Sequence, residues 1–146
     1  MAIKNPQGNF NFKLALDGVD NARVQVVTAP SVEWAVHKQG TQGNSPDQKT
    51  PGKKQIGELV VKVLVPMDGD GELWDKLEAA QTMDRAQYCG DGFLYETDQD
   101  GATQQTFKIV NAWISKVETE DYDTKADNSA DLIRTVTFQV EDYRKV

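Results

Sequence analysis

The side chains in this sequence that could perform chemistry are mostly carboxylates. The chain contains 23 Asp and Glu residues but only one histidine, His37, and one cysteine, Cys89. Two carboxylates facing one cleft could act as the acid and the base of a glycosidase. The acids gather in turns and polar segments instead, at Asp84, Asp91, Glu96, Asp98, Asp100 and 118–123. Acids are common in such solvated places, so we expect no enzyme, and a small acid/base hydrolase is the weaker alternative.

Nucleophile and metal motifs are not evident either. No serine or cysteine lies in a nucleophile motif near His37, and Cys89 has no Cys or His neighbour at metal-ligand spacing. The segment 68–71, Asp-Gly-Asp-Gly, is similar to the start of a calcium loop, but its twelfth position is Ala79 rather than a glutamate. We therefore expect no cofactor and no metal, and we interpret Asp70 as the cap of a helix.

Three tryptophans could form a stacking platform for sugars or bases. Each of them lies within an apolar pattern, which favours a buried position instead. The predicted core residues are Phe12, Trp34, Leu59, Trp74, Trp113 and Phe138. Exposed tryptophans would fit a carbohydrate-binding β-sandwich, and this is the alternative from a different class of function.

Length and charge restrict the answer further. The 146 residues predict a single domain, 1–146, and 16 Lys and Arg leave a formal net charge of −7. This charge argues against sequence-specific binding of nucleic acid, although it suits a passage along which DNA slides, as well as ordinary solubility. The N-terminus lacks the apolar core of a signal peptide, and no run reaches the roughly 18 to 20 apolar residues of a membrane span. We expect no membrane anchor and assembly in a cytoplasm.

The elements that position these residues are mostly strands. Apolar residues alternate or cluster over 10–16, 22–28, 31–38, 56–65, 92–97, 104–117 and 132–140. One amphipathic helix is predicted over 72–81, with Leu73, Trp74 and Leu77 on its apolar stripe. The sequence thus predicts a mainly β fold, a sandwich or barrel of about six to eight antiparallel strands with one flanking helix.

A long polar segment interrupts the strands. Residues 39–54 carry almost no apolar side chain and are rich in Gly, Gln, Asn, Ser, Pro and Lys. A loop of this length is uncommon in a small domain unless it is disordered or functional. Because an apolar strand follows it directly, we interpret it as an extended interaction loop that contacts a neighbouring subunit. Its contact residues are expected to be Gln42, Asn44, Lys49, Pro51, Gly52, Lys53 and Lys54.

The order of these elements resembles the tube proteins of contractile bacteriophage tails and related injection machines. The resemblance rests on Phe10-Asn11-Phe12 with Asp17-Gly18, on 29–33, on 51–59, on Leu73-Trp74, on Asn111-Ala112-Trp113 and on 136–140. It implies a tail-tube-like fold with a long inter-subunit loop. Tubes of bacteriocin-like particles, extracellular injection systems and, more distantly, type VI secretion use the same kind of subunit.

The resemblance implies a structural role. Homohexameric rings would stack into a hollow tube, which sheath contraction drives through a target envelope and which conducts DNA or cargo. The implied partners are further copies of the chain and the tail sheath, baseplate, tail terminator and tape measure proteins, in a virion tail assembled in the host cytoplasm. The predicted lumen residues are the polar alternates Arg23, Gln25, Glu33 and His37, and the excess of acid predicts a negative channel.

Overall fold

The computed structural model describes residues 11–16, 19, 23–40, 48–66, 69–98, 100–120 and 132–146. These residues form nine strands and three short helices. In chain order they are β1 (Asn11–Ala15), β2 (Val24–Thr28), β3 (Val32–Gln39), β4 (Gln48–Ile56), β5 (Glu58–Leu64), α1 (Gly71–Ala79), the 3-10 helix η2 (Ala80–Thr82), α2 (Arg85–Tyr88), β6 (Gly90–Thr97), β7 (Thr103–Thr119), β8 (Ile133–Gln139) and β9 (Asp142–Lys145). The predicted mainly β fold is confirmed. The predicted turn at Asp17-Gly18 lies outside the described residues.

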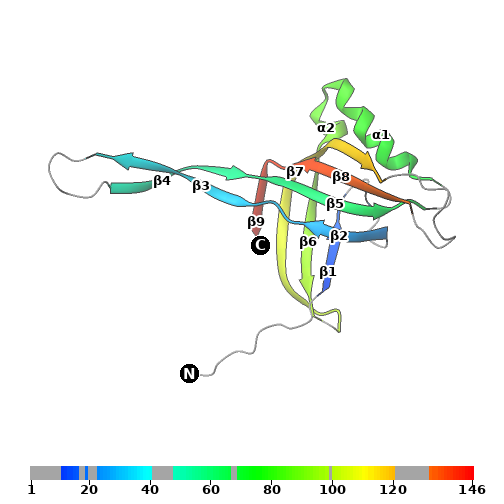
Figure 1. Cartoon of the computed structure of the whole chain (residues 1–146), viewed down its shortest axis with the longest axis horizontal. Helices are drawn as coiled ribbons and strands as arrows, with labels where there is room; N and C mark the ends of the chain where they lie inside the picture. Colours follow the sequence, from blue (N-terminus) through cyan, green and yellow to red (C-terminus); the bar gives the residue numbers. More distant parts are fainter. Residues whose placement is uncertain are drawn as a thin grey trace.

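Seven strands form the body of the molecule. Their order is β1-β6-β7-β8-β5-β2, and β9 pairs with β7. Strand β7 is 17 residues long and belongs to two layers, since its first part pairs with β6 and β9 and its second part with β8. Figure 1 shows that β1, β6 and β9 run nearly at right angles to β2, β5 and β8. The body is therefore a sandwich of two crossed layers that share one bent strand.

The core lies between these layers. Leu59 of β5 lies opposite Phe138 of β8, and Val61 lies opposite Val136. All four side chains are at most 2% exposed. The second layer contributes Leu14, Leu94 and Ile109 to the same cluster. The period-two spacing of these residues places them on one face of each strand, as the apolar alternation predicts.

Two α-helices flank the body, where one was predicted. Helix α1 begins and ends close to the predicted bounds 72–81, buries Leu73, and continues into η2. Helix α2 was not predicted, because four residues are too few to show a helical period. The carboxylate of Asp84 caps α2 by accepting a hydrogen bond from the backbone N–H of Ala86 at 3.1 Å. No helix in the described ranges is long and apolar enough to cross a membrane.

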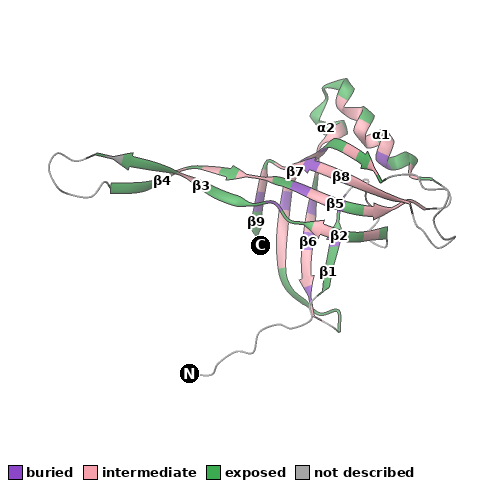
Figure 2. Ribbon diagram, in the orientation of Figure 1, coloured by how far each residue is buried: buried purple, intermediate pink, exposed green. Residues whose placement is uncertain are grey.

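Strands β3 and β4 form a separate two-stranded sheet, which we call the arm. It projects away from the body, and most of its length is exposed (Figure 2). The prediction of a loop over 39–54 is wrong for Gln39, which ends β3, and for residues 48–54, which belong to β4. These residues show no apolar alternation because, among the described strands, only β3 pairs with β4 and no second layer covers residues 48–54.

Candidate assembly surfaces

The apolar alternation of β3 lies on the surface of the arm. Val32 is 43% exposed, Trp34 57% and Val36 60%. Together with Pro51 of β4, the side chains of Trp34 and Val36 line a shallow apolar hollow. An isolated hairpin is marginally stable in water, and an exposed tryptophan beside aliphatic side chains is typical of a contact surface. The arm therefore has the character of a surface that a partner covers.

The arm is bent near the point where it leaves the body. The pairing register of β3 and β4 shifts between Trp34 and Val36, and such a bulge bends a strand. Gly52 of β4 lies at this shift, and a Cβ atom there would be only 2.9 Å from Cδ2 of His37. Glycine thus allows the His37 ring to lie against the backbone of β4, and the bend is encoded in the sequence.

The arm and the rest of the chain carry opposite charges. The charged residues of 32–56 are Lys38, Lys49, Lys53, Lys54, Glu33 and Asp47. Their sum is +2, and because the whole chain carries −7, the remainder carries −9. A basic arm and an acidic body attract each other when they belong to different copies of the chain.

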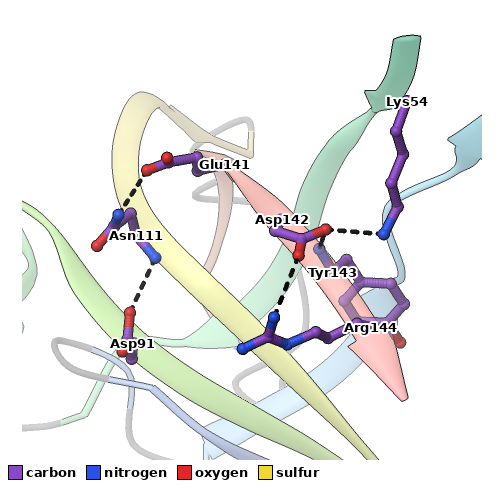
Figure 3. Close-up of polar contacts among 7 residues, drawn as sticks. All are labelled: Lys54, Asp91, Asn111, Glu141, Asp142, Tyr143 and Arg144. Atoms are coloured by element: carbon purple, nitrogen blue, oxygen red, sulfur yellow. Dashed lines mark hydrogen bonds and ion pairs between the residues drawn. The ribbon is translucent and has the colours of Figure 1, made fainter. Parts of the chain in front are cut away.

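Lys54 connects the base of the arm to the body, as Figure 3 shows. Its Nζ atom lies 2.9 Å from Oδ1 of Asp142, the first residue of β9. The same carboxylate accepts a hydrogen bond from the backbone N–H of Tyr143 at 2.9 Å, and Arg144 Nη1 lies 3.9 Å from its second oxygen. The hydrogen bond from Lys54 lowers the pKa of Asp142. Asp142 is thus kept as an anion that faces the arm.

Asn111 forms the corner at which β7 passes from one layer to the other. Its φ of 49° is left-handed, a region that asparagine tolerates better than most residues. Its backbone N–H donates to Asp91 Oδ1 at 3.0 Å, and its side-chain amide donates to Glu141 (Figure 3). Glu141 also pairs with Arg85 of α2 at 3.0 Å. The corner therefore connects both layers to the helical flank.

Two substitutions separate the backbone of this corner from its side chain. Asn111→Gly and Asn111→Ala both remove the hydrogen bond to Glu141, but only alanine must place a Cβ atom in the left-handed conformation. We expect the alanine variant to be less stable by about 1 kcal/mol than the glycine variant, measured by urea unfolding. Equal free energies of unfolding would show that the left-handed backbone does not limit stability.

Asp70 holds α1 against the sheet. Asp70 occupies the N-cap of α1, as predicted, and its carbonyl oxygen accepts a hydrogen bond from the backbone N–H of Leu73 at 3.0 Å, but its side chain caps no backbone N–H. Its carboxylate instead pairs with Arg134 of β8 and accepts a hydrogen bond from Trp74 Nε1 at 3.1 Å. Arg134 also lies over the Trp74 ring, 5.1 Å from its centroid, and donates to Thr119 at 2.6 Å. The ion pair competes with capping because it neutralises a largely buried guanidinium.

Removing the charge of Asp70 tests this connection. Asp70→Asn keeps the shape and an acceptor for Trp74, but leaves Arg134 without its carboxylate partner. We expect the free energy of unfolding to fall by about 2 kcal/mol. The matched control is Glu118→Gln, which breaks the exposed pair with Lys116 and should change stability by less than about 0.5 kcal/mol. Equal losses in the two variants would contradict the role of Asp70.

The outer surface of β5, β8 and the second part of β7 is mostly polar, with Val60 as an apolar residue within it. Because Leu59 and Val61 point into the core, Glu58 and Lys62 point away from it. Gln139 lies opposite Glu58 and donates to its carboxylate at 2.9 Å. We define the polar face as Glu58, Lys62, Ser115, Lys116, Glu118, Thr135, Thr137 and Gln139. Its two acids and two bases offset each other.

The four residues predicted for a lumen do not share one surface. Arg23 and Gln25 are exposed at the start of β2, whereas Glu33 and His37 are exposed on the arm. The prediction continued the alternation of one strand into the next. The structure differs because β3 leaves the layer of β2 and pairs only with β4 among the described strands.

The predicted core residues fall into three groups. Leu59 and Phe138 are buried, and Trp74 and Trp113 are half-buried. Phe12 is 37% exposed and Trp34 57%, so a core position is wrong for both in the single chain. Phe12 is the second residue of the edge strand β1, and Trp34 lies on the arm, which no second layer covers among the described strands.

The residues predicted for the interaction loop are divided as well. Lys49, Pro51, Gly52, Lys53 and Lys54 lie on β4, whereas Gln42 and Asn44 lie outside the described residues. Sequence reasoning did not find Glu141 and Asp142, which follow the last predicted strand. Their only signal is an acidic pair beside a strand end. In the parts of the chain that are described, no three His, Cys, Asp or Glu side chains gather as metal ligands do.

Comparisons with known proteins agree with this geometry. The family model described as T4-like virus tail tube protein gp19 matches residues 8–144. None of the curated proteins compared with the chain matches it.

Solved structures share the fold at low sequence identity. A chain of the sheath/tube terminator of PVC, an extracellular contractile injection system, is 15% identical with a TM-score of 0.76, over 99% of this chain and 98% of that chain. A chain of the tube-terminating cap of the anti-feeding prophage is 12% identical with a TM-score of 0.78, over 100% and 94%. A chain of the PVC sheath-tube complex is 16% identical with a TM-score of 0.73, over 97% and 90%. The similarity extends over nearly the whole length of each chain.

Proposed function

The chain belongs to the family of T4-like virus tail tube proteins, and from this premise we propose that it is the structural subunit of the inner tube of a contractile tail. Copies of the chain form six-membered rings, and the rings stack into a hollow tube. The tube is driven through a target envelope when a surrounding sheath contracts. The subunit acts by assembly and mechanical rigidity, and it needs no cofactor.

The arm is the observation that carries this proposal. It places an exposed apolar patch and three lysines, Lys38, Lys49 and Lys53, at a distance from the body, where they make no core of their own. A second copy supplies both a surface for Trp34 and Val36 and the opposite charge. We therefore assign the arm to the contact between subunits, with Lys49, Pro51, Gly52 and Lys53 on its contacting strand.

The edges of the body support closure into a ring. Strands β1 and β2 end the sheet order, so each has one unpaired side among the described strands. Unpaired edges favour pairing with another chain, and pairing around a closed ring removes the edges of every copy.

We assign the lumen to the polar face rather than to Arg23, Gln25, Glu33 and His37. The polar face carries hydroxyl, amide and charged groups around Val60, and Lys116 and Glu118 form an ion pair on it, which suits a water-filled channel. Its charges offset each other, in place of the negative channel that the total charge suggests. Such a wall neither binds nor repels phosphate strongly, so DNA or protein cargo can slide along it.

The partners follow from the same role. Structures with this fold come from a sheath-tube complex, a baseplate and tube terminators. We propose that this chain likewise contacts sheath, baseplate and terminator proteins, with a tape measure protein and DNA or cargo inside. Phage tails, bacteriocin-like particles and extracellular injection systems all fit the proposal. We therefore propose that the protein is located in the tail of a virion or in an injection particle.

Negative-stain electron microscopy of the purified protein tests the proposal. We expect rings with six-fold symmetry and stacks of them at high protein concentration, or beside baseplate and sheath proteins. A monodisperse monomer under all of these conditions would overturn the tube function. A monomer that binds an oligosaccharide through Trp34 would instead support the carbohydrate-binding alternative.

A further inference from the structure

We infer that the ion pair between Lys54 and Asp142 is a latch that fixes the direction of the arm. The pair joins β4 to β9, which are 88 residues apart in the sequence. It is the only ion pair between the arm and the body in the described ranges. This role goes beyond subunit contact, because it concerns how one chain holds its own arm before a partner arrives.

The latch lies close to the junction about which the arm could rotate relative to the body. The chain enters the body at Gly57, whose N–H donates to the carbonyl oxygen of Ser31 at 2.8 Å. A Cβ atom at Gly57 would lie 2.5 Å from Ser31 Oγ, so the two strands approach each other closely at this point. Next to this junction Ile56 packs against the core of the body, whereas the residues of β4 before Lys54 are mostly exposed. Lys54 adds a second attachment three positions further along β4.

Asp142 is prepared for this contact. The backbone N–H of Tyr143 and the guanidinium of Arg144 orient its carboxylate before Lys54 binds. The preceding residue, Glu141, is held by Asn111 and Arg85, so the segment that carries Asp142 is itself tied to the corner of β7 and to α2. Figure 3 shows Glu141 and Asp142 directed to opposite sides, one toward the corner and one toward the arm. Lys54 therefore docks on a rigid part of the body.

The length of the arm makes a small rotation important. From Lys54 to Gln48 the strand extends about 20 Å, at about 3.3 Å per residue. A rotation of about 10° at Lys54 moves the tip by about 3.5 Å, which is more than the tolerance of a hydrogen bond. A partly exposed ion pair contributes little to global stability. Its effect is expected in the direction of the arm rather than in the melting temperature.

Distances between two spin labels in the monomer test the latch independently of tube assembly. The labels are placed on Gln48→Cys in the arm and Met83→Cys beside the helices, in a Cys89→Ser background. We expect one narrow distance distribution in the parent protein. Asp142→Asn and Lys54→Met should each lose it and give a broad distribution, whereas Lys54→Arg, which keeps the charge, should preserve it.

The control variant is Glu118→Gln, which breaks an exposed ion pair between two residues of β7 and should leave the distribution narrow. Unchanged melting temperatures would show that all variants remain folded. A distribution in Asp142→Asn as narrow as in the parent protein would overturn the latch, whether or not tubes form. If Asp142→Asn broadens the distance distribution and also prevents tube formation, the latch positions the arm for assembly. If Asp142→Asn broadens the distribution but still forms tubes at the parent concentration, the latch has no such role in assembly.

Discussion

Trp34→Ala is expected to leave the domain folded and to abolish tube assembly at concentrations where the parent protein assembles. Trp34 is 57% exposed in the single chain, so its removal should change the free energy of unfolding by no more than about 0.5 kcal/mol. A tryptophan anchor at an interface contributes about 2 kcal/mol or more, which raises the concentration needed for assembly roughly thirty-fold. Light scattering against protein concentration measures this shift.

The matched control for Trp34 is Trp34→Phe, which keeps an aromatic ring of smaller size. We expect this variant to assemble at an intermediate concentration. Thermal unfolding at low concentration separates the two effects, because it reports on the body alone. If Trp34→Ala assembles like the parent protein, the arm patch is not the contact surface.

Phe138→Ala should have the largest effect on stability. Phe138 is 2% exposed and lies opposite Leu59 in the core between the two layers. Truncation of a buried phenylalanine removes its transfer free energy and leaves a cavity, so we expect a loss of about 3 to 5 kcal/mol. Chemical unfolding by urea, followed by far-UV circular dichroism, measures it.

Phe138→Leu keeps most of the buried volume and should lose much less than the alanine variant. Phe12→Ala is a second control, because Phe12 is 37% exposed and should contribute far less. Similar losses for Phe12→Ala and Phe138→Ala would contradict the assignment of the core to the space between the two layers.

The body of the fold could be predicted because its signals are local. Leu59 and Val61 belong to an apolar run on a strand that the chain itself covers, and Val136 and Phe138 alternate with polar residues on the neighbouring strand. Helix α1 has a full apolar stripe. In each case the period of the apolar residues and the element that buries them belong to one chain.

The arm could not be predicted in the same way. The alternation of Val32, Trp34 and Val36 indicates one covered face, but it does not say what covers that face. The polar strand β4 has no period at all, although Pro51 and Gly52 mark its bend. Both strands were misjudged for one physical reason, namely that no layer among the described residues covers the arm.

The contacts between distant residues were also beyond the sequence. Asp70 has the position of a helix cap, yet its carboxylate forms an ion pair with Arg134, which is 64 residues away in the sequence. The contact of Asp142 with Lys54 can be recognised only when β9 is placed beside the base of the arm. The left-handed corner at Asn111 had a partial signal, since asparagine tolerates this backbone and the apolar period of β7 changes there.

A cryo-EM reconstruction of assembled tubes tests the central claim most directly, because it shows where the arm of each copy lies. We expect the arm to lie on another copy of the chain, with Trp34 and Val36 covered and with the polar face toward the channel. An arm that stays in solvent or folds back on its own body, with Trp34 exposed in the tube wall, would contradict the claim.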